Sequence, residues 1–153
     1  MNVSIRRLVK LCLLTLAWLS FTAAAQDFDR STRTILVAGA TGTQGGAVAR
    51  ELNARGYRVK GLTRNPNSER ARAMTALGIE MVQGNFDDPE SLDAALAGAY
   101  GAFSVQQYRG VGVDGEIRQG KAFADAAKRA GVQHFVYTSV AKATLNTGVP
   151  QFE

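Results

Sequence analysis

Residues 35–46 read ILVAGATGTQGG, an apolar run that passes directly into a glycine-rich turn. A short continuous apolar run that ends in glycine is typical of a strand buried on both faces of a parallel sheet. Gly39, Gly42 and Gly45 follow at intervals of three. At a strand-to-helix turn such glycines permit a sharp bend, a close approach to a pyrophosphate, and tight packing of helix on strand. The stretch therefore predicts a dinucleotide site, with a plain tight turn as the alternative.

Short apolar runs alternate with helical periodicity over the rest of the chain. We expect strands at residues 34–38, 57–63, 79–82, 101–105 and 134–139, with a helix between each pair. Strands separated by helices form right-handed βαβ units, which place the strands in one parallel sheet. The sequence therefore predicts an α/β fold with a Rossmann-like, doubly wound sheet of five strands in the order 3-2-1-4-5.

The first 25 residues have the order of parts that an export signal requires. Three basic residues and no acidic ones accompany an apolar run at 11–21, and Ala23 and Ala25 follow it. As a helix the run would span about 16 Å, roughly half the hydrocarbon thickness of a bilayer. We expect a signal peptide over 1–25, a short linker over 26–32, and a periplasmic protein after cleavage. An uncleaved inner-membrane anchor is the alternative.

The net charge of +5 belongs mostly to this leader. The chain has 18 Lys and Arg against 13 Asp and Glu, and without the leader's three basic residues 15 oppose 13. Nucleic-acid binding requires a basic stripe on the folded body, so this composition argues against such a partner. Membrane contact is expected only through the leader. No metal site is expected either, because His134 is the sole histidine and Cys12 the sole cysteine.

The residues around the glycine turn and at the end of the second strand bear on the choice between NAD and NADP. The helix N-terminus formed by Thr41, Thr43 and Gln44 with the glycines would present N–H groups to phosphates. An NAD site usually has an acidic residue about 20 positions after the glycines, at the end of the second strand. Arg64 stands there instead, and its guanidinium suits a 2′-phosphate. The sequence thus favours NADP over NAD, with a solvated surface arginine as the alternative.

The loop after the third strand supplies the last cofactor candidates. It reads Gly-Asn-Phe-Asp-Asp over residues 84–88 and should lie at the same edge of the sheet. Phe86 could stack on adenine and Asp87 could accept a hydrogen bond from it, while Asp88 is expected to cap the next helix. An ordinary strand-to-helix loop explains the stretch equally well.

Four stretches together resemble the NmrA-like family of atypical short-chain dehydrogenase/reductases. They are residues 35–45, 63–66 (TRNP), 82–88 (VQGNFDD) and 130–139 (AGVQHFVYTS). The resemblance implies an NADP-binding Rossmann domain over 33–153, in a family that reduces quinones or other small carbonyl substrates or senses NADP without turnover. The chain departs from the family at Asn85, where an acidic residue is common. It also stops before the family's substrate-binding part, so we expect a fold truncated before its C-terminal portion.

The catalytic residues of such reductases are not evident. Dehydrogenase relatives use Tyr-x-x-x-Lys, and none of the four tyrosines here has Lys four positions later. Tyr137 is expected to pack in the core, and Ser139 at the end of its strand is the one catalytic candidate. Gln106, Gln107 and Tyr108 could line the nicotinamide side of the site.

Three functions therefore stay open: an NADPH-dependent reductase, an NADP sensor, and an inactive remnant. An unfinished sheet edge also invites pairing with another chain, which predicts oligomerisation or marginal stability.

Overall fold

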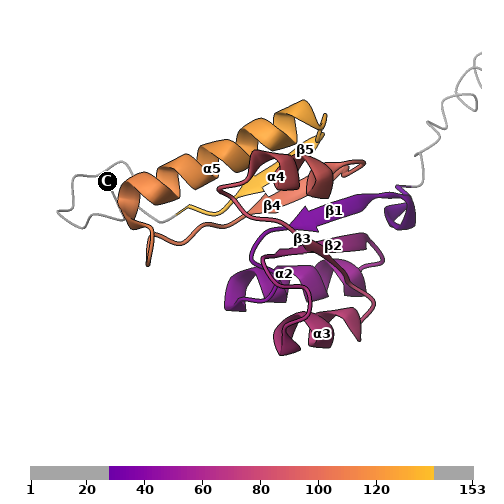
Figure 1. The fold of residues 1–153 in the computed structure, drawn as a ribbon. Helices are drawn as coiled ribbons and strands as arrows, with labels where there is room; N and C mark the ends of the chain where they lie inside the picture. The colour runs from indigo at the N-terminus through magenta and orange to yellow at the C-terminus, as the bar shows by residue number, and fades with distance from the viewer. Residues whose placement is uncertain (1–27, 140–153) are drawn as a thin grey trace, which may run out of the picture.

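The computed structural model describes residues 28–139, in which helices cover both faces of a five-stranded parallel sheet (Figure 1). The strands are β1 (Thr34–Val37), β2 (Arg58–Thr63), β3 (Glu80–Gln83), β4 (Gly101–Ser104) and β5 (His134–Tyr137). The helices are the 3-10 turn η1 (Arg30–Thr32) and α2 (Thr43–Ala54), α3 (Glu69–Thr75), α4 (Pro89–Leu96) and α5 (Gly112–Arg129). The strand order is β3-β2-β1-β4-β5 with every pairing parallel, so the predicted topology is confirmed.

The helix ends follow from local sequence. The Asp88 side chain accepts a hydrogen bond from the backbone N–H of Ser91 at 3.3 Å, which confirms it as the cap of α4. Ser68 caps α3 in the same way. Helix α5 ends with Lys128 and Arg129 in its last turn, where basic side chains interact favourably with the helix dipole. Within the described residues, no helix combines the length and apolarity needed to cross a bilayer.

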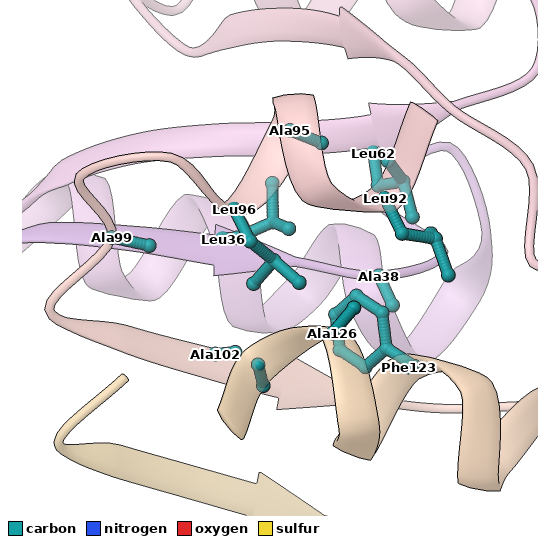
Figure 2. Packing of buried hydrophobic residues seen from close by; sticks show 11 residues of the cluster. Leu36, Ala38, Leu62, Leu92, Ala95, Leu96, Ala99, Ala102, Phe123 and Ala126 are labelled. Carbon is teal, nitrogen blue, oxygen red and sulfur yellow. The ribbon is translucent and has the colours of Figure 1, made fainter. Parts of the chain in front are cut away.

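Two hydrophobic clusters hold the layers together, one on each face of the sheet. Leu36 of β1 packs with Leu92 of α4 and Phe123 of α5, and Figure 2 shows these side chains converging between the sheet and the two helices. The neighbouring residue Val37 belongs to the second cluster, on the face covered by α2 and α3. The alternation along β1 explains its unbroken apolar sequence, because both of its faces are buried.

Strand β5 differs from the others in its exposure. Its four residues are all exposed, with 49% for Tyr137 and 38% for Phe135, although the Phe135 ring lies 6.0 Å from that of Phe123. The expectation that Tyr137 packs in the core is therefore wrong for the described structure. The physical reason is position: β5 is the outermost strand, and no strand within residues 28–139 pairs with its far edge.

An aromatic cluster of Phe28, Arg33, Tyr57 and Tyr100 covers the amino ends of the strands. The guanidinium carbon of Arg33 lies 4.0 Å from the ring centroid of Tyr100 and 4.5 Å from that of Phe28. The Phe28 ring also meets the Tyr57 and Tyr100 rings edge-on, each at 6.3 Å. Such cation–π and edge-to-face contacts are stabilising. The Phe28 ring thus contacts the domain, although residues 28–32 are all exposed. The linker expected over 26–32 stays a prediction, and the predicted signal peptide lies outside the described residues.

Candidate functional site

A cavity of about 730 Å³ opens at the carboxyl ends of the strands. This is the edge at which open α/β sheets bind ligands, because loops and helix N-termini converge there. All residues predicted to bind the cofactor line it: Gly39, Thr41, Gly42, Thr43, Gln44, Gly45, Arg64, Phe86 and Asp87. The structure therefore brings together residues from three separate loops, and their contact with a cofactor stays a prediction.

The glycine loop has the geometry that its spacing predicted. Gly39 adopts φ +62, and its carbonyl accepts a hydrogen bond from the N–H of Gly42 at 2.8 Å. A Cβ on Gly45 would lie 2.3 Å from the carbonyl oxygen of Ala38, so only glycine lets α2 approach β1 this closely. Gly42 precedes α2 without a side-chain cap, which leaves N–H groups of the first turn available to an anion.

Two arginines lie on the β2 side of the cavity. Arg64 directly follows β2, and Arg70 comes from the first turn of α3. Neither side chain forms an ion pair with any residue in the described range 28–139. Local hydrogen bonds shape the connecting segment, since the Asn65 side chain accepts from the N–H of Asn67 at 3.0 Å. Sequence reasoning missed Arg70, although its position two residues after the cap Ser68 was a usable signal.

The loop after β3 is tied to α5 by side-chain contacts. One Asp87 carboxylate oxygen accepts from Gln119 Nε2 at 3.0 Å and the other from Arg118 Nη2 at 3.3 Å. The Phe86 ring packs edge-on against that of Phe123, with 5.6 Å between centroids. Phe86 thus borders the cavity while its ring also packs against the hydrophobic core. Gln119 was not predicted, because no local pattern links residues 32 positions apart.

The segment after β4 forms the opposite wall. Gln106 and Gln107 line the cavity as expected, and Arg109 and Val111 join them, whereas Tyr108 does not. Ser104, at the end of β4, is fully buried, and its hydroxyl and the Gln106 side-chain amide hydrogen-bond at 3.0 and 3.2 Å. These two hydrogen bonds hold the buried Gln106 side chain at the cavity wall.

The catalytic candidate follows β5, the last strand of the described residues. Ser139 is exposed and is not among the residues that line the cavity. Over residues 28–139 no three His, Cys, Asp or Glu side chains are grouped closely enough to hold a metal ion. The cavity therefore offers backbone N–H donors, guanidinium groups and one fixed carboxylate, a set that suits recognition of a phosphorylated nucleotide.

The chain is similar in sequence to one protein family and to curated members of it. The NmrA-like family profile matches residues 31–153. The NmrA-like family domain-containing oxidoreductase notA of Aspergillus sp. (strain MF297-2) is 45% identical over 114 residues, which cover 70% of this chain and 34% of that protein. The chain therefore spans about a third of the length of this relative.

Solved structures with the same fold include proteins with bound nicotinamide dinucleotides. The Citrobacter sp. triphenylmethane reductase complexed with NADP(H) has a TM-score of 0.67 and 32% identity, over 78% of this chain and 41% of that one. NmrA, a negative transcriptional regulator, in complex with NADP has a TM-score of 0.66 and 30% identity, over 79% and 37%. The same regulator has also been solved with NAD.

Proposed function

Because the chain belongs to the NmrA-like family, we propose that it binds NADP(H) in the cavity at the carboxyl end of its sheet. The observation that carries the proposal is the glycine loop, where Gly45 lets the first turn of α2 face the cavity without a capping side chain. The pyrophosphate would lie against these N–H groups and the positive end of the helix dipole. The adenosine would lie toward β2 and β3, between Arg64 and Asp87.

The proposed preference for NADP over NAD rests on Arg64 and Arg70. Both line the cavity and have no acidic partner within 28–139, so their charge is available to a 2′-phosphate. A hydrogen bond to a charged group contributes about 1.5–3 kcal/mol, which corresponds to at least tenfold in affinity.

Calorimetric titration with NADP⁺ and NAD⁺ tests this preference. We expect Arg64→Gln to weaken NADP⁺ binding by about tenfold or more and to leave NAD⁺ binding nearly unchanged. Arg72→Gln is the matched control, because Arg72 lies on α3 and is exposed but does not line the cavity. Tighter binding of NAD⁺ by the unaltered chain would contradict the assignment.

For the activity, we propose NADPH-dependent reduction of a quinone or another small carbonyl substrate. The support is membership of a family that includes oxidoreductases and a structural neighbour that is a reductase. The test is oxidation of NADPH, followed by its absorbance, in the presence of a small benzoquinone. Turnover is the expected result.

A sensor that binds NADP(H) without turnover is the second candidate. The observation that favours it is the position of Ser139, which is exposed and outside the cavity lining. A neighbouring structure is also that of a transcriptional regulator. Binding of NADPH without oxidation by any quinone would select this candidate, and failure of both would indicate an inactive remnant.

We further propose export through the leader and self-association through β5. The exported form should begin at Gln26, which mass spectrometry of the periplasmic fraction would show.

In the described structure β5 is an edge strand with exposed Phe135 and Tyr137, and such edges pair readily with a second copy. Sedimentation should therefore detect a dimer, and a monomer at all concentrations would contradict this.

A further inference from the structure

Helix α5 is linked to the loop after β3 at two points on one of its faces. Gln119 donates to the Asp87 carboxylate, and Phe123, one turn further along, meets the Phe86 ring edge-on. Residues four apart on a helix lie on the same side, so α5 presents both contacts together. Asp87, Phe86 and Gln119 itself all line the cavity. The wall at this end of the cavity is therefore positioned by a helix distant in sequence.

The two donors to Asp87 are not equivalent. Gln119 is only 8% exposed and its Nε2 lies 3.0 Å from Asp87 Oδ2, whereas the Asp87 side chain is 46% exposed. The Arg118 side chain is 64% exposed and its Nη2 lies 3.3 Å from Oδ1. Exposed ion pairs contribute little because solvent screens them. The buried amide of Gln119 is thus the stronger restraint on the carboxylate.

We propose that Gln119 is a positioning residue that orients the Asp87 carboxylate and so sets selectivity for the adenine base of the bound dinucleotide. This inference rests on the proposed binding of NADP(H). An ionised carboxylate offers about four acceptor positions, and Gln119 and Arg118 occupy two of them. Asp87 lines the cavity, so the remaining positions are available to a donor there.

Adenine supplies such a donor in its exocyclic amino group. Hypoxanthine has a carbonyl oxygen at the same place, which cannot donate and is repelled by a carboxylate. A fixed carboxylate therefore distinguishes the two bases, whereas a freely rotating one turns away from the unfavourable partner. The orientation imposed by Gln119 is what converts Asp87 into a selective contact.

The test compares NADP⁺ with nicotinamide hypoxanthine dinucleotide phosphate by calorimetric titration. We expect Gln119→Met, which keeps the side-chain volume and removes the donor, to weaken NADP⁺ binding about five- to tenfold. Binding of the hypoxanthine analogue should change less than about twofold, so the preference for adenine falls. Gln119→Glu, which replaces the donor by an acceptor, should lower the preference at least as much.

Two comparisons separate positioning from packing. Gln133→Met is the matched control, because Gln133 is an exposed glutamine at the amino end of the sheet, and it should change neither affinity. In Asp87→Asn the preference should already be reduced, and adding Gln119→Met should reduce it no further, since the glutamine acts through the carboxylate.

The outcomes are distinguishable from those for the proposed function. The positioning role would be overturned if Gln119→Met and Gln119→Glu lost affinity equally for both dinucleotides, so that the preference for adenine did not change. That result would not contradict the proposed binding of NADP(H). Absence of NADP⁺ binding by the unaltered chain would overturn the proposed function itself. Thermal unfolding of each variant shows whether a loss reflects the site or the fold.

Discussion

The two ends of the sheet are built from different residues although they share the same strands. At the carboxyl end, the chain leaves β1 through glycines, and the loops enclose a polar cavity. At the amino end, Tyr57 and Tyr100 directly precede β2 and β4; both rings meet the Phe28 ring edge-on, and the Arg33 guanidinium lies over the Tyr100 ring. One end thus presents the glycine loop to a cavity, and the other carries a cluster of aromatic rings around a guanidinium group.

This difference separates binding from stability. The proposed ligand recognition at the carboxyl end requires the absence of a side chain at Gly45, because a Cβ there would collide with the backbone. Stability at the amino end depends on what is present, because Phe28 carries both aromatic and cation–π contacts. Substitutions at the carboxyl end should therefore change dinucleotide affinity, whereas substitutions at the amino end should change only the free energy of unfolding.

The largest effect is expected for Gly45→Ala. The new Cβ would lie 2.3 and 2.4 Å from two backbone carbonyl oxygens, so β1 and α2 must separate. We expect loss of dinucleotide binding and a free energy of unfolding lower by at least about 3 kcal/mol, as for severe overpacking. Urea unfolding and NADP⁺ titration measure the two effects.

The control is Gly56→Ala, at the end of α2. Gly56 has φ +86, but a Cβ there would meet nothing within 4 Å, so the cost is only that of the backbone conformation, about 1–2 kcal/mol. NADP⁺ affinity should not change. If both variants lost binding equally, the close approach at Gly45 would not be what matters for the site.

A smaller effect, confined to stability, is expected for Phe28→Ala. The ring contacts Tyr57, Tyr100 and Arg33, and its removal should lower the free energy of unfolding by about 1–2 kcal/mol. NADP⁺ affinity should stay within about twofold, because the cavity lies at the other end of the sheet. A strong loss of affinity would show that the two ends are coupled.

The smallest effect is expected for Asp29→Asn, and only in its pH dependence. Hydrogen bonds from the Ser31 hydroxyl at 2.7 Å and N–H at 2.9 Å lower the pKa of Asp29 below 3.8. A lowered folded-state pKa stabilises the fold above the unfolded pKa, and this contribution is lost as the pH falls through the folded value. Urea midpoints of the two proteins should therefore differ slightly at pH 6 and converge only as the pH falls below the lowered pKa of Asp29. A constant difference across this range would contradict the prediction.

Much of the fold and of the site could be predicted because their signals are local. The buried strand at 34–37, the glycine spacing and the cap at Asp88 depend on neighbours within a few residues. The cavity lining at Arg64 followed from the rule that parallel strands end at one edge. Gln119 and the exposed Tyr137 could not be predicted, because each depends on which distant element lies beside it.

The chain's own residue pattern was sufficient for the strand order, the position of the site and the types of group that line it. Periodicity and backbone freedom at glycine, which act over short stretches of chain, located the strands and the glycine loop. The right-handed connection of parallel strands and the usual order of doubly wound sheets then gave the topology. Only the folded arrangement decided that Asp87 is held by Gln119 of α5 and that Phe28 covers Arg33. Such contacts join residues from separate elements, and packing selects one pairing among many that the sequence permits.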